Sequence, residues 1–161
     1  MTPLLSGLET FVHQYSAMVD LCVGAVAMMD FINGLPVACL DKGFTNHGRI
    51  VSSIKSWVPW MPAVPLGLGQ QGIPQLVIMA YFEVLFIAAD PYLPDVTPAL
   101  FLPNRAVVIN RIWSTLLRLQ RNQKEAKGST EEIETALSMV VVPLTYAVRY
   151  CRSRPPGDWA G

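Results

Sequence analysis

Three carboxylate side chains lie within apolar stretches of this sequence: Asp20, Asp30 and Glu83. A carboxylate among apolar residues usually pairs with a cation, faces a protein interior, or lines a path for protons or ions. Asp20 and Asp30 are ten residues apart, which separates them by about 15 Å on an unbroken helix, so they could not bind one ion together. We predict interhelical or intersubunit polar contacts for these carboxylates and for Arg105 and Arg111. An ion pathway is the alternative.

The two histidines, His13 and His47, are candidates for binding a cofactor. Glu9 precedes His13 by four residues and would share its face of a helix. His47 has no Cys, His, Asp or Glu three or four residues away. Because a structural metal site usually needs at least three protein ligands, we predict no metal site. A single imidazole could still ligate haem or chlorophyll, and Glu83 is a further candidate ligand.

Known catalytic motifs are missing from the sequence. The segment Gly67 to Gly72 fits the Gly-x-Gly-x-x-Gly pattern, but it follows a proline-rich stretch rather than a predicted strand. No nucleophile elbow, zinc-protease or kinase pattern occurs. The cysteines, Cys22, Cys39 and Cys151, are odd in number and widely spaced, which indicates small apolar residues rather than a disulfide framework. We therefore predict a protein that is not an enzyme.

The distribution of charge predicts lipid as part of the surroundings. Charged residues make up 15% of the chain, against about 25% in typical soluble domains, and the mean hydropathy is +0.35. No Lys or Arg precedes Lys42, and none lies between Lys55 and Arg105. Such long stretches favour a membrane-embedded protein. The net charge of zero argues against nucleic acid as a partner, because that binding needs a clustered cationic surface.

The apolar residues gather in four segments, which predict a mainly α fold. We expect one domain over 1–161, a small membrane-embedded bundle of about three to four apolar helices, some kinked or interfacial. The segment 73–89 is the clearest membrane span, with Pro74 in its first turn, and the third segment is amphipathic with a basic face. The four segments cover residues 16–40, 73–89, 98–117 and 133–150.

Several residues predict where these helices break, begin or end. Gly34 and Pro36 should break or kink the first helix near its end, and Pro143 should kink the fourth. Ser129 or Thr130 should cap the fourth helix. We expect residues 118–132 to form a charged linker outside the membrane and residues 155–161 to form an irregular tail.

Two tryptophans, Trp57 and Trp60, are candidates for anchors at a membrane–water interface. They follow a basic segment and are interleaved with Pro59, Pro62 and Pro65, which exclude a regular helix. The indole ring is amphipathic and favours such an interface. The alternative is a proline-rich surface loop whose indole rings are buried on the protein itself.

Three short pieces of the sequence are similar to a known family. His47-Gly48-Arg49-Ile50-Val51, the spacing of Gln75 and Glu83, and Asn104-Arg105-Ala106-Val107 resemble, in order, motifs of the chlorophyll a/b and fucoxanthin light-harvesting proteins. That family has a Glu ahead of each Arg, and the resulting ion pairs ligate chlorophyll. Here the corresponding places are apolar, at Phe44 and around Leu100. The resemblance therefore assigns no pigment ligand in this chain.

The preferred hypothesis is a non-catalytic accessory subunit of a large membrane-embedded energy-transducing complex, stabilising the packing of other membrane subunits and of lipids. Carboxylates that need partners and short, broken helices favour this role, because such a bundle gains stability against larger subunits. The mitochondrial inner membrane, with electron transport, is the preferred location, and the thylakoid membrane is the alternative. The other hypotheses are a pigment-associated subunit that binds chlorophyll or carotenoid, a small transporter or ion pathway using Asp20, Asp30 and Glu83, and a soluble helical protein with a deep apolar ligand cavity.

Overall fold

The computed structural model describes residues 2–40, 72–89 and 102–153. It therefore does not describe several residues singled out above: His47, Trp57, Trp60 and the tail 155–161 lie outside these ranges.

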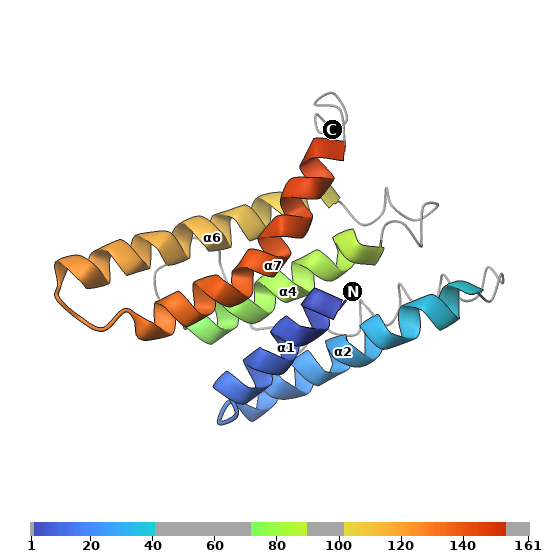
Figure 1. The fold of residues 1–161 in the computed structure, drawn as a ribbon, viewed down its shortest axis with the longest axis horizontal. Helices are drawn as coiled ribbons and strands as arrows, with labels where there is room; N and C mark the ends of the chain where they lie inside the picture. Colours follow the sequence, from blue (N-terminus) through green and yellow to red (C-terminus); the bar gives the residue numbers. More distant parts are fainter. Residues whose placement is uncertain (1, 41–71, 90–101, 154–161) are drawn as a thin grey trace.

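The described part of the chain is mainly helical, as predicted. Helix α1 (Thr2–Gln14) and helix α2 (Val19–Leu40) form an antiparallel pair, and helix α6 (Leu102–Glu125) and helix α7 (Glu131–Ser153) form another (Figure 1). Helix α4 (Ile73–Ala89) lies between the two pairs and packs against all four other helices.

Helix α4 has the predicted bounds, but its surroundings differ from the prediction. Every side chain from Leu76 to Ala88 is buried, so the helix is apolar on all sides because neighbouring helices cover all sides. Over 17 residues it rises about 25 Å, less than the roughly 30 Å of a bilayer's hydrocarbon core. Among the helices of the described ranges, none has the length and apolar character needed to cross a membrane. The predicted span at 73–89 is therefore not supported.

Helix α1 was missed by the sequence prediction. Its apolar residues Leu4, Leu8, Phe11 and the following Tyr15 are all buried, and their spacing of three or four residues places them on one face. The short segment also carries polar residues, such as Glu9 and His13, on its exposed side. Only the packing against α2, α4 and α7 makes this weak pattern a stable helix.

Helix α2 is continuous to Leu40, so the helix does not break at Gly34 and Pro36, where a break or a kink was predicted. Its inward face consists of Leu21, Ala25, Met28 and Ile32, all buried. These residues follow the helical repeat of three or four and pack into the same core as α1 and α4.

Helix α6 is longer than predicted and ends in a Schellman motif. It continues to Glu125, so residues 118–125 of the predicted linker are helical, because Arg, Leu, Gln and Lys are good helix formers. The N–H of Gly128 donates to the carbonyl of Gln123 at 2.9 Å, and the N–H of Lys127 donates to the carbonyl of Lys124 at 3.1 Å. Lys127 has a φ of 56°, so it occupies the left-handed position that glycine usually takes.

Helix α7 begins at Glu131 and continues through Pro143. The Ser129 hydroxyl accepts a hydrogen bond from the Glu131 amide at 3.5 Å. The Thr130 hydroxyl donates to the Glu134 carboxylate at 3.0 Å. Acidic residues in the first turn also favour this end of the helix, because its backbone amides carry partial positive charge.

Candidate functional site

A partly buried ion pair joins helices α4 and α6. The guanidinium Nη1 of Arg105 donates to Oε2 of Glu83 at 2.9 Å, and the Glu83 side chain is 10% exposed. The Arg105 guanidinium carbon also lies 4.0 Å from the centre of the Phe86 ring. Glu83 and Phe86 are three residues apart and share one face of α4. The cation is therefore held both by a carboxylate and by an aromatic face.

Burial has the largest effect on the pKa of Glu83. Loss of solvation raises the pKa of Glu83, while the charge and the hydrogen bond of Arg105 lower it, and the net effect is a raised pKa. A group whose folded-state pKa is raised stabilises the fold most below its unfolded-state pKa. The contribution of Glu83 to stability therefore declines as the pH rises through its folded-state pKa.

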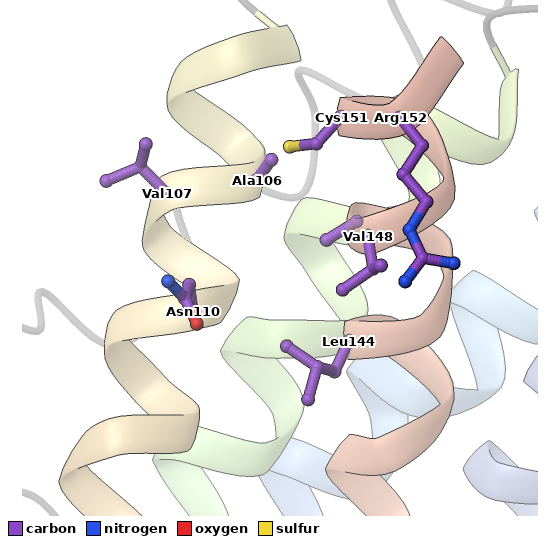
Figure 2. A pocket seen from close by; sticks show the side chains of 8 residues that line it. Ala106, Val107, Asn110, Leu144, Val148, Cys151 and Arg152 are labelled. Carbon is purple, nitrogen blue, oxygen red and sulfur yellow. The ribbon is translucent and has the colours of Figure 1, made fainter.

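A groove of about 410 Å³ lies between the start of α6 and the end of α7. Helix α6 contributes Ala106, Val107 and Asn110, and helix α7 contributes five residues (Figure 2). The lining is mostly apolar, and Asn110 and Arg152 are its polar members. The lining residues of α7 are Leu144, Ala147, Val148, Cys151 and Arg152.

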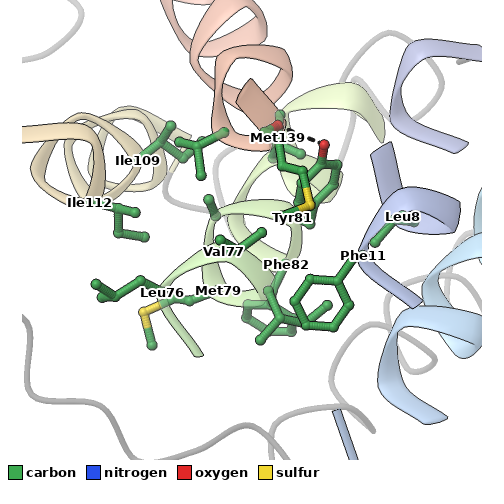
Figure 3. Close-up of a cluster of buried hydrophobic side chains, with 14 of the residues drawn as sticks. Leu8, Phe11, Leu76, Val77, Met79, Tyr81, Phe82, Ile109, Ile112 and Met139 are labelled. Atoms are coloured by element: carbon green, nitrogen blue, oxygen red, sulfur yellow. Dashed lines mark hydrogen bonds between the residues drawn. The ribbon is translucent and has the colours of Figure 1, made fainter. Parts of the chain in front are cut away.

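A buried hydrogen bond connects α4 to α7 where a proline interrupts the helical pattern. Pro143 has no N–H, so it cannot donate to the carbonyl four residues earlier, that of Met139. The Tyr81 hydroxyl donates to this carbonyl at 2.7 Å (Figure 3). Burial raises the pKa of Tyr81, which keeps the hydroxyl protonated as a donor. The Tyr81 hydroxyl of α4 therefore takes the place of the backbone N–H that α7 lacks at Pro143.

Glycine in α1 makes room for this hydrogen bond. A Cβ atom placed at Gly7 would overlap the hydroxyl of Tyr81. Gly7 itself is buried, so α1 approaches α4 closely where the Tyr81 ring ends. Helices α1, α4 and α7 therefore meet at this point, where Gly7 lies next to the Tyr81 hydroxyl and that hydroxyl donates to the Met139 carbonyl.

The structure brings together only some of the residues predicted to act as a site. Glu83 and Arg105 are in contact, whereas Asp20, Asp30 and Arg111 are exposed on the outer faces of their helices. Asp20 and Asp30 lie on α2 and Glu83 lies on α4. The three carboxylates therefore differ in environment, two in solvent and one buried against a guanidinium.

The candidate cofactor ligands His13 and Glu83 lie on different helices, α1 and α4. His13 is exposed near the end of α1, and Glu83 already binds Arg105. Within the described ranges, no three His, Cys, Asp or Glu side chains are close enough together to hold a metal ion. Cys22 donates to the carbonyl of Tyr15 at 3.2 Å, a structural contact at the turn between α1 and α2.

Two features were missed by sequence reasoning. The α6–α7 groove was not predicted, although Val107 and Val148 carry a usable signal, since each adds an apolar residue on the polar side of an amphipathic helix. The Tyr81 contact was not predicted either. Its signal was Pro143 within a helix, which leaves one identifiable carbonyl without a donor.

Comparisons with protein families, with curated proteins and with solved structures found no match to this chain.

Proposed function

We propose that this chain is a non-catalytic accessory subunit that docks, through the outer face of α2, onto a larger partner in an energy-transducing membrane complex. The observation that carries the proposal is that α2 is apolar on the side facing away from the bundle as well as on the side facing it. Val19 is 66% exposed and Val23 is 63% exposed, and Val26 is also exposed.

The outward valines form a row rather than isolated exposed residues. Val19, Val23 and Val26 are spaced by four and three residues, so they lie on one side of α2. The buried residues Leu21 and Ala25 lie on the other side. A helix that is apolar all round is usually covered all round, which supports a partner on the outer side.

Two exposed carboxylates near this row of valines favour a protein partner with basic residues. Asp20 and Asp30 flank Val23 and Val26 along the helix, and both are exposed. Hydrocarbon would leave these charges without partners, whereas Lys or Arg of another subunit would pair with them. An apolar centre with charges at its rim is the usual arrangement of a protein interface.

The membrane setting of the partner is part of the proposal. Further exposed apolar residues on α6 and α7, among them Leu117 and Val141, would contact other subunits or lipid. The mitochondrial inner membrane is the first location to test, and the thylakoid membrane is the second.

The test is native gel separation after gentle detergent extraction of membranes that contain the tagged chain. We expect the wild type to migrate in a large complex and Val23→Glu to migrate alone, because the new charge would be buried in the interface. Gln14→Glu is the matched control, since Gln14 is exposed on neighbouring α1. Migration of the wild type alone would refute the accessory role. Retention of Val23→Glu in the complex would exclude the α2 face as the contact.

The same gel band tests the pigment-associated alternative. A chlorophyll or carotenoid absorption spectrum that co-migrates with the chain would favour a thylakoid complex. Haem absorption would favour an electron-transport complex.

A further inference from the structure

The groove between α6 and α7 combines an apolar floor with a cation at its edge. We propose that it binds a single-chain anionic amphiphile of the fatty-acid class. The acyl chain would lie between the two helices, and the carboxylate would lie at Arg152. This inference goes beyond the proposed docking role and concerns a different face of the molecule.

The floor of the groove suits an alkyl chain. Its apolar members come from both helices, and two of them, Val107 and Val148, are 49% and 39% exposed. Covering such side chains removes apolar surface from water, which is the main driving force for binding a hydrocarbon. The volume of about 410 Å³ falls within the range of about 300–1,000 Å³ found for small-molecule sites.

The charge at the groove selects an anion. Arg152 follows Val148 by four residues and lines the groove with it, and its guanidinium lies along α7 at the edge farther from α6 (Figure 2). Among the described residues, no acidic side chain lines the groove and none forms an ion pair with Arg152. A guanidinium can bind a carboxylate through two parallel hydrogen bonds. Asn110 adds an amide donor from the opposite helix.

The pattern of one cation beside a long apolar surface favours an amphiphile over other anions. A nucleotide or a sugar phosphate would need more polar partners than Asn110 and Arg152 supply. The helix ends do not select the charge, because the positive end of α6 and the negative end of α7 lie together at this groove and offset each other. Arg152 therefore determines which charge the groove prefers.

Binding is tested by calorimetric titration of the full chain with dodecanoate below its micelle concentration, and with methyl dodecanoate as the uncharged probe. We expect saturable binding of one dodecanoate and weaker binding of the ester. Arg152→Gln should weaken dodecanoate binding about threefold to fivefold, the range of an exposed ion pair. Arg149→Gln is the control, since Arg149 is exposed on the same helix but outside the groove.

A second pair of variants tests the apolar floor. Val148→Phe should fill the groove and abolish saturable binding. Val141→Phe should leave it unchanged, because Val141 is similarly exposed, at 44%, two turns earlier on α7 and outside the groove. Equal unfolding midpoints for the two variants would show that both are folded.

The thiol of Cys151 gives an independent readout inside the groove, where it points from α7 towards α6 (Figure 2). Bound dodecanoate should slow alkylation of Cys151 but not of Cys22, which lies near the α1–α2 turn. Absence of saturable dodecanoate binding, or equal binding of the ester and the acid, would overturn the proposal. So would equal effects of Val148→Phe and Val141→Phe.

Discussion

Replacing Tyr81 by phenylalanine removes one hydroxyl group and leaves the rest of the buried ring in place. Its partner, the carbonyl of Met139, would then have no donor, because residue 143 is a proline. Both side chains are buried, with Tyr81 at 0% and Met139 at 3% exposed, so water cannot easily take the place of the hydroxyl. An unsatisfied buried polar group costs about 1–3 kcal/mol. We therefore expect Tyr81→Phe to lower the free energy of unfolding by about 2 kcal/mol.

The measurement is urea-induced unfolding followed by circular dichroism, with Tyr15→Phe as the matched control. The Tyr15 hydroxyl is buried and has no hydrogen-bond partner among the described residues. Its removal should therefore leave stability unchanged or raise it slightly. A similar loss for both variants would mean that the hydrogen bond to Met139 is not the cause.

A double-mutant cycle with Pro143→Ala tests whether the Tyr81 hydroxyl replaces the N–H that is missing at position 143. Alanine at position 143 restores an N–H that can donate to the Met139 carbonyl within α7. The cost of Tyr81→Phe should then fall by about 1 kcal/mol or more, within the range of coupling found for residues in one hydrogen-bond network. An unchanged cost in the two backgrounds would refute the claim that Tyr81 replaces the donor missing from Pro143.

Three further predictions concern the contacts between helices and the end of α6. Gly7→Ala should destabilise the protein, because the new Cβ would overlap the Tyr81 hydroxyl; thermal unfolding measures this, and an unchanged midpoint would contradict the close approach of α1. Arg105→Met should cost about 3 kcal/mol at neutral pH by leaving the buried Glu83 unpaired. That cost should shrink at acidic pH, where the raised pKa of Glu83 lets it become neutral, so urea titrations at several pH values check the sign. Lys127→Gly should stabilise the protein by about 0.5–1 kcal/mol by relieving a left-handed φ of 56°, and a loss in the same urea assay would contradict this.

The segment 73–89 shows that the sequence predicted the position of a helix but not its surroundings. Its apolar residues correctly placed the helix, including the start near Pro74 and the end at Ala89. The same residues could not distinguish lipid from protein as the surrounding medium, because both are apolar. The decisive information, that α1, α2, α6 and α7 cover this helix, involves residues far from it in the sequence.

For the candidate site, the sequence likewise identified the unusual residues, and only the structure shows which of them are in contact. Glu83 was singled out because a carboxylate in an apolar run needs a partner, and Arg105 was singled out as a basic residue in the next apolar segment. Their pairing requires α4 and α6 to lie side by side at one particular register. Asp20 and Asp30 had the same local pattern, yet they are exposed, because they lie outside the face of α2 that packs into the core through Leu21, Ala25, Met28 and Ile32.

The sequence by itself therefore determined the helical class, the approximate location of every described helix except α1, and the residues whose charge requires an explanation. These properties depend on the helical repeat and on local residue preference, which operate over a few positions along the chain. The tertiary structure decided which apolar face is covered, which carboxylate has a cation, and that the hydroxyl of Tyr81 satisfies the carbonyl freed by Pro143. Those outcomes depend on contacts between distant segments, such as the 58 residues that separate Tyr81 from Met139, and no local pattern encodes them.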